Sequence, residues 1–180
     1  MGETNTKSEP LFQVSTDVWV SASPQEVYAV VSDMGRAAEW SVECVGGEWV
    51  SGEPATVGAV FRGKNRRGRE VVSWAPVVRG EWTTDSEVVA AEPGRVFSWA
   101  IRTKAGQAQD SVWTFEMAPA EGGCVLTHHF RMGEPTEGIR GITAGMDDEE
   151  KRRFFTEWGA KLEKDIAATL GRIKDVIEKK

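Results

Sequence analysis

The sequence of 180 residues contains only two cysteines, two histidines and one tyrosine, and these scarcities exclude several classes of protein. Two cysteines, Cys44 and Cys124, are too few for a disulfide-rich secreted scaffold, and their separation does not match the spacing of metal ligands. With so few histidines and cysteines, no cluster suited to a metal ion is evident. We therefore expect two reduced thiols, and neither a metal nor another cofactor.

Long apolar runs and a secretion signal are also missing. No stretch approaches the ~20 apolar residues that a membrane-spanning helix needs. The opening residues MGETNTKSEP lack the apolar core of a signal peptide. We therefore expect a cytoplasmic protein without a stable membrane anchor, in which residues 1–10 form a disordered tail and residues 11–180 form a single domain.

Positive charge is in the minority, because 22 Lys and Arg stand against 28 Asp and Glu, which gives a net charge of −6. A field of this sign repels nucleic acid, so nucleic acid is not an expected partner. The one basic run, RGKNRRGR at Arg62–Arg69, contains no aromatic residue on which a base could stack. The sequence predicts a solvated hairpin tip there.

Tryptophan is abundant by contrast, with eight residues of this type against one tyrosine. A tryptophan side chain brings a large apolar area and a single N–H that needs a partner. Some of these rings are expected to build the core. Others are candidates for the wall of an apolar cavity.

The stretch from Asp147 to about Ile177 has the pattern of a long amphipathic helix. Asp147 and Glu150 have the spacing of a capping box. Charged residues, Lys161 and Asp165 among them, are assigned to the solvent face. The apolar face has spacings of three or four and consists of Phe155, Trp158, Leu162, Ile166, Leu170, Ile173 and Ile177. A large concave partner must cover this face.

Upstream of this helix the apolar pattern mostly has a period of two, which is typical of β-strands. A first strand at Phe12–Ser21 precedes a helix with Ser23 as its N-cap and one more helical turn at Arg36–Trp40. Glu70–Arg79 could extend a strand, form its own strand or be an insertion, and Gly133–Gly145 is predicted to be a loop. The further strands are predicted at Val42–Val50, Ala59–Asn65, Glu81–Ala90, Arg95–Arg102, Asp110–Met117 and Cys124–Met132.

The short connections between these strands indicate an antiparallel meander. The predicted fold class is therefore α+β: a strongly bent antiparallel sheet of about seven strands gripping the long C-terminal helix, with two short helices after the first strand.

Alternation along the strands assigns a mainly aromatic set of side chains to the concave face of the sheet. His128 is the candidate orienting group among them, with Thr84 and Ser86 as further polar groups, although a lone inward histidine is more often a hydrogen-bonded core residue. The residues predicted to bind a ligand are Phe61, Trp82, Phe97, Trp99, Trp113, Phe115, His128, Phe130, Phe155 and Trp158.

These elements, in this order, resemble the START-like superfamily (SRPBCC, helix-grip fold) and, within it, the polyketide cyclase/dehydrase-like family. The matching stretches are VSASPQEVYAVVSDM with Trp40, VGAVFRGKNRRG, EVVAAEPGRVFSWAI and SVWTFEMAPAEGGCVLTHHF, within roughly Phe12 to Ile177. The resemblance implies a largely apolar cavity between sheet and helix for lipid-like, polyketide-like or other hydrophobic ligands. Its members include carriers and cyclases, so it implies no single function.

Three functions fit these observations. We favour a protein that binds a small hydrophobic molecule. A cyclase or aromatase would use the same cavity with a positioned acid or base, for which His128, Tyr28, Glu116 and Asp110 are the candidates. A protein-interaction module would instead have a filled core. The sequence shows no convincing catalytic constellation and no phosphate-binding loop, and it leaves monomer and dimer equally open.

Overall fold

A computed structural model of the protein describes residues 9–179, so most of the predicted N-terminal tail lies outside the described part. None of the helices within these residues combines the length and the apolar character needed to cross a membrane. The elements are β1 (Phe12–Val20), α1 (Pro24–Val31), the 3-10 helix η1 (Met34–Glu39), β2 (Cys44–Ser51), β3 (Val60–Arg67), β4 (Gly80–Glu92), β5 (Val96–Arg102), β6 (Ala108–Ala120), β7 (Gly123–Met132), α2 (Glu137–Thr143) and α3 (Asp148–Glu178).

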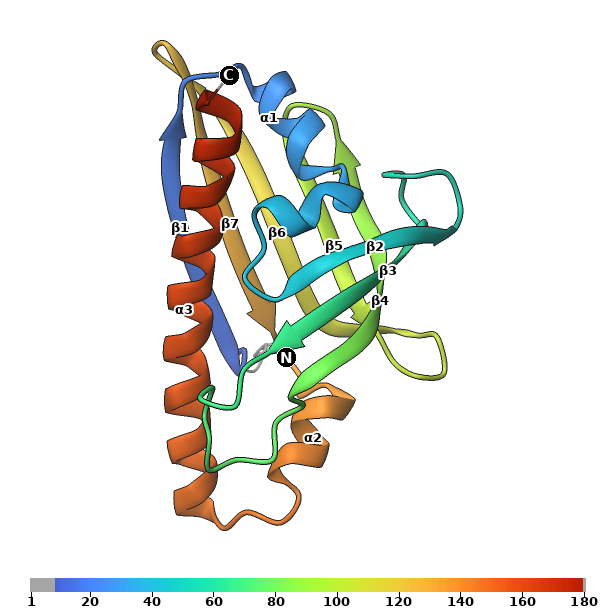
Figure 1. Ribbon diagram of the computed structural model, residues 1–180, viewed down its shortest axis with the longest axis vertical. Helices are drawn as coiled ribbons and strands as arrows, with labels where there is room; N and C mark the ends of the chain where they lie inside the picture. Colours follow the sequence, from blue (N-terminus) through green and yellow to red (C-terminus); the bar gives the residue numbers. More distant parts are fainter. Residues whose placement is uncertain (1–8, 180) are drawn as a thin grey trace, which may run out of the picture.

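The strands form one 7-stranded sheet in the order β1-β7-β6-β5-β4-β3-β2. Every neighbouring pair is antiparallel, and β1 lies beside β7 in a register that runs from Phe12↔Met132 to Val20↔Cys124. The sheet curves, and α3 lies along its β1–β7 edge on the concave side (Figure 1). The predicted α+β helix-grip architecture is confirmed.

The capping residues expected from the sequence begin the helices as predicted. The Ser23 hydroxyl accepts the backbone N–H of Glu26 at 3.1 Å, and Pro24 follows at the first helical position. At the start of α3, the Asp147 carboxylate accepts the Glu150 N–H at 2.8 Å, while the Asp147 N–H donates to the Glu150 side chain at 3.3 Å. This reciprocal capping box fixes where the long helix begins.

The buried face of α3 differs from the prediction at its N-terminal end. Phe154 is fully buried, whereas Phe155 is half-buried and packs edge-on against Phe12 with 5.8 Å between ring centroids. Phe154 lies four residues before Trp158 and continues the buried row. Because spacings of three and four both keep a residue on one helix face, the sequence pattern did not distinguish the two adjacent phenylalanines.

Residues 68–79, which we call the strap, connect β3 to β4 and are an insertion rather than a strand. The Trp74 indole N–H donates to the Glu157 carboxylate of α3 at 2.7 Å, and the Arg153 guanidinium lies 4.3 Å from the Trp74 ring. Ala75 and Val77 are buried. The strap therefore packs on the N-terminal half of α3, beside α2 (Figure 1).

Arg79 organises the strap from within. Its guanidinium donates to the backbone carbonyls of Val71, Val72, Ala75 and Val77 at 2.7–3.2 Å. A segment without a ladder partner must satisfy its carbonyl groups in some other way, and one planar side chain with five N–H donors does so here.

The predicted loop at Gly133–Gly145 contains a short helix, α2, so this prediction was wrong in part. Its glycines lower the helix propensity and produced the loop signal. The Thr136 hydroxyl caps the helix by accepting the Ile139 N–H at 3.3 Å, and Ile139 is buried. The Thr136 cap and the burial of Ile139 together stabilise the helix by more than the low helix propensity of the glycines destabilises it.

We predict that Arg79→Met lowers the free energy of unfolding by about 2 kcal/mol, because several partly buried carbonyls lose their donor. Amide hydrogen exchange in the strap should accelerate. Arg69→Met is the matched control, because Arg69 is exposed and has no hydrogen-bond or ion-pair partner among the described residues. Equal stability of the two variants in urea unfolding would contradict this role of Arg79.

Candidate functional site

A cavity of about 350 Å³ lies between the concave face of the sheet and α3. Strands β3 to β7 supply one wall, and α3, η1 and α2 supply the others. Its volume is near the lower end of the range typical of small-molecule sites. The aromatic residues of the lining are Trp40, Phe61, Trp82, Trp99, Trp113, Phe115, Phe130 and Trp158.

Most of the predicted ligand-binding residues lie around this cavity, and two do not. Phe97 is buried outside it, packed edge-on against Tyr28 at 6.1 Å and beside Trp99. Phe155 faces Phe12 at the edge of the sheet. The predicted residues that line the cavity are Phe61, Trp82, Trp99, Trp113, Phe115, His128 and Phe130, from alternation along the strands, and Trp158, from the apolar face of α3.

The strand register joins several of these rings into a continuous wall. Trp99 lies directly opposite Trp113, and Trp113 lies opposite Phe130, so three adjacent strands place aromatic side chains side by side. The Trp113 and Phe130 ring centroids are 4.3 Å apart. Cross-strand aromatic pairs of this kind stabilise the sheet and present a flat apolar surface to the cavity.

His128 is stacked into this wall and is only 3% exposed. Its ring lies parallel to that of Phe115 with 4.0 Å between centroids, and its Nδ1 is 2.9 Å from the Thr114 carbonyl oxygen. Because a carbonyl can only accept, Nδ1 carries the proton, and Nε2 of the neutral ring presents a lone pair. Burial lowers the pKa of His128 from 6.5 to about 4 and so keeps the ring uncharged at neutral pH.

A second polar region of the lining is an ion cluster formed by Glu43, Arg67, Lys161 and Asp165. Arg67 donates twice to Glu43, at 2.5 and 2.9 Å, and Lys161 contacts both Glu43, at 3.3 Å, and Asp165. Burial alone would raise the pKa of Glu43, but the hydrogen bond from Arg67 and the nearby charges outweigh it, so the pKa is lowered. Two cations and two anions cancel, so the cluster brings no net charge to the cavity.

Aromatic rings hold the Arg67 side chain in place. Its guanidinium carbon lies 4.4 Å from the centroid of Trp82 and 4.9 Å from that of Trp158. The Lys161 ammonium is 5.1 Å from Trp158. Cation–π contacts of this kind strengthen when water is excluded, so the cluster and the aromatic wall stabilise one another.

This ion cluster was not predicted from the sequence, and two predictions placed its residues wrongly. Residues 62–67 belong to β3 rather than to a solvated hairpin tip, and Arg67 shares the inward face of that strand with Phe61 and Asn65. Lys161 and Asp165 line the cavity instead of lying on the solvent face of α3. Alternation from Phe61 would have indicated Arg67, but the run of basic residues masked this signal.

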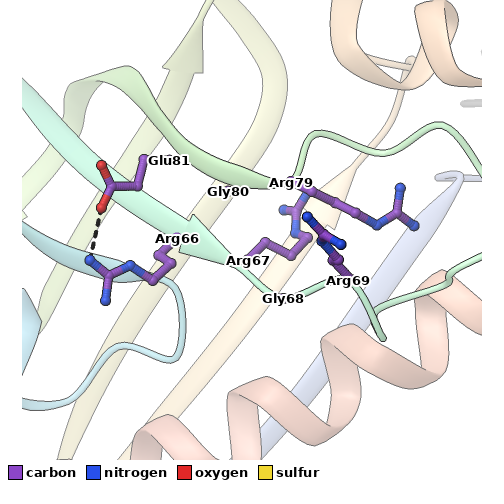
Figure 2. A pocket seen from close by; sticks show the side chains of 7 residues that line it. All are labelled: Arg66, Arg67, Gly68, Arg69, Arg79, Gly80 and Glu81. Carbon is purple, nitrogen blue, oxygen red and sulfur yellow. Dashed lines mark hydrogen bonds and ion pairs between the residues drawn. The ribbon is translucent and has the colours of Figure 1, made fainter.

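A separate hollow of about 500 Å³ lies near the strap and has several arginines in its lining. Figure 2 shows Arg66 pointing away from the others toward Glu81, with which it pairs at 2.8 Å. Arg67 is bound to Glu43 and Arg79 to the strap carbonyls, so Arg69 is the one guanidinium of this hollow without a partner among the described residues. One exposed cation does not make a built anion site.

The other acid and base candidates lie outside the cavity lining. Glu116 is exposed and pairs with His129 at 3.3 Å, and Asp110 is exposed and pairs with Arg131 at 3.1 Å. Tyr28 packs against Phe97, and burial raises the pKa of its hydroxyl. His128 is therefore the one candidate from the sequence that faces the cavity.

The depressed pKa of His128 predicts acid sensitivity in a defined window. Between pH 6.5 and about 4 the unfolded chain binds a proton at His128 that the folded chain does not, so stability falls as the pH falls. The loss is up to about 3 kcal/mol, at about 1.4 kcal/mol per pKa unit. Urea unfolding at several pH values should show this loss for the wild type and a shallower profile for His128→Phe. Parallel profiles would contradict the assignment.

The ion cluster predicts a contrast between two arginines of β3 that each bind a carboxylate twice. The side chain of Arg67 is 9% exposed, whereas that of Arg62, paired with Asp85, is 51% exposed. Arg67→Met should lower the free energy of unfolding by about 3 kcal/mol, because it leaves Glu43 short of a partner in an apolar setting. Arg62→Met should cost less than about 1 kcal/mol. Equal costs in urea unfolding would show that burial of the pair is unimportant.

Comparisons with known proteins agree with this geometry. The chain is similar to the Polyketide_cyc-like protein Cgl2372 from Corynebacterium glutamicum, with 27% identity over 96% of each chain and a TM-score of 0.58. It matches the di-domain aromatase/cyclase BexL of the BE-7585A biosynthetic pathway at 18% identity and a TM-score of 0.65, over 93% of this chain but only 50% of BexL. It also matches SA2116 from Staphylococcus aureus, a protein of unknown function, at 13% identity over 93% of each chain and a TM-score of 0.64.

A search of curated proteins finds no match. The model of the family described as polyketide cyclase / dehydrase and lipid transport matches residues 12–178, which is nearly the whole chain. The START-like resemblance drawn from the sequence is thereby confirmed, and the chain belongs to the polyketide cyclase / dehydrase and lipid transport family.

Proposed function

We propose that the protein binds a small, largely apolar molecule in the cavity between the sheet and α3. The observation that carries this proposal is the continuous aromatic wall of Trp99, Trp113 and Phe130 beside a cavity of about 350 Å³. Flat apolar walls with a few placed polar groups are typical of sites for such molecules. The family description, which includes lipid transport, supports a hydrophobic ligand.

A cyclase or aromatase reaction in the same cavity is the alternative, favoured by the name of the BexL neighbour. Such a reaction needs a group whose pKa is near the working pH. Burial makes His128 a weak base, with a pKa of about 4, and both carboxylates of the lining are engaged in the ion cluster. These features favour binding over proton transfer.

An interaction module with a filled core is the third possibility. A core filled by its own aromatic side chains would leave only voids smaller than a ligand. The cavity of about 350 Å³ therefore favours a ligand-binding role over this one.

Titration with 2-methoxynaphthalene, an uncharged apolar probe, tests the proposal. We predict saturable quenching of tryptophan fluorescence, and about tenfold weaker binding by Trp113→Ala, because a ring of the wall is lost. Trp19→Ala is the matched control, since Trp19 is 43% exposed and is absent from the cavity lining. Its affinity should be unchanged. Absence of saturable binding, or equal losses in both variants, would count against the proposal.

A further inference from the structure

Five polar side chains of the lining are more than nine-tenths buried and have atoms without a hydrogen-bond partner among the described residues: Asn65, Ser86, Ser111, His128 and Thr169. Ser86 is 5% exposed, Ser111 is 2% exposed and His128 is 3% exposed. All three line the cavity, and of their side-chain polar atoms only Nδ1 of His128 has a hydrogen-bond partner within residues 9–179. None of the remaining atoms of these three side chains is enclosed without a partner, so they are open to the cavity. An occupant that displaces water from them has to replace the hydrogen bonds of that water, which favours an occupant that pairs with them.

These side chains differ in the kind of hydrogen-bonding group that an occupant must offer them. A serine hydroxyl donates or accepts, so Ser86 and Ser111 do not discriminate. Nε2 of His128 can only accept, because the ring proton is on Nδ1 and is donated to the Thr114 carbonyl. The histidine therefore requires a hydrogen-bond donor on the occupant.

On the basis of the proposed function, we propose that the cavity selects an uncharged, largely apolar molecule whose hydroxyl group donates a hydrogen bond to Nε2 of His128. An ether of the same shape has no proton to donate. A carboxylate places a negative charge against a lone pair and brings an unbalanced charge into an apolar wall.

The ion cluster supports the choice of an uncharged occupant. Arg67 and Lys161 are the cations of the lining, and Glu43 and Asp165 already neutralise them. An anionic ligand would have to displace a partly buried carboxylate from its ion pair to reach either cation. Such displacement leaves a partly buried charge without its partner, which is unfavourable.

The strand register also gives the polar groups a spacing. Ser111 lies opposite Met132, and Met132 is four residues along β7 from His128. At ~3.3 Å per residue, the positions of Ser111 and His128 along the strands are therefore about 13 Å apart. Trp113 and Phe130 occupy the level between them. An apolar body against these rings thus places a terminal hydroxyl at His128, and a longer molecule places a second polar group near Ser111.

Three probes that share one ring system test the selection: 2-naphthol, 2-methoxynaphthalene and 2-naphthoate. The wild type should bind 2-naphthol about tenfold more tightly than the ether, the size of one net hydrogen bond, and 2-naphthoate most weakly. His128→Phe, which preserves an aromatic stack, should weaken 2-naphthol to the level of the ether and leave the ether unchanged. His129→Gln is the matched control, because His129 lies on the outer face, paired with Glu116, and should keep the full preference.

The outcomes separate this inference from the function on which it rests. Equal affinities of the wild type for 2-naphthol and the ether, or a preference that survives in His128→Phe, would overturn the inference and leave a ligand-binding protein. Failure of all three probes to bind would overturn both.

A second measurement uses the wild type alone and so does not depend on how a variant folds. Nitrogen-15 NMR of the histidine side chains reports hydrogen bonding at Nε2. We expect 2-naphthol to shift the Nε2 resonance of His128 in the direction of an accepted hydrogen bond, and 2-methoxynaphthalene to leave it nearly in place. Saturation with 2-naphthol without such a shift would overturn the inference.

Discussion

The packing of α3 against one edge of a curved sheet is the constraint on which the cavity depends. The helix contacts β1 and β7, while the concave face continues across β6, β5, β4 and β3. One helix is too narrow to cover that face. The short elements α2 and η1 cover part of what remains, and the space left between them is the cavity.

The ionisable side chains of the lining avoid the free-energy cost of an unpaired buried charge in two different ways. The ion cluster keeps its charges and cancels them internally, with the guanidinium of Arg67 in contact with two indole rings. His128 is instead uncharged at neutral pH, because burial lowers its pKa and favours the neutral ring. Both solutions leave the cavity without net charge, so its selectivity depends on shape and on hydrogen-bond donors and acceptors.

Much of the fold follows from local patterns in the sequence. A period of two, turn residues and two N-terminal caps were sufficient to predict the strands, α1 and α3, because these signals act within a few residues. The same alternation placed Trp113 and His128 on the cavity wall. These predictions needed no knowledge of which segments meet in space.

The predictions from the sequence were wrong where contacts between residues distant in the sequence determine the local structure. Phe154 rather than Phe155 is buried because of how α3 is rotated against the sheet, and α2 forms because Ile139 finds a buried site despite the glycines around it. Alternation from Phe61 indicates the inward face for Arg67, but its partners, Glu43 and two tryptophans, are distant in sequence and could not be read from it. Such pairings are set by tertiary packing, which local propensity and periodicity do not describe.

Intermolecular nuclear Overhauser effects between 2-methoxynaphthalene and the isotope-labelled protein test the central claim, that the cavity holds an apolar ligand, most directly. This account predicts contacts from the probe to the rings of Trp99, Trp113 and Phe130, which line the cavity. Contacts confined to exposed side chains such as Trp19, or no contacts at saturating probe, would contradict it.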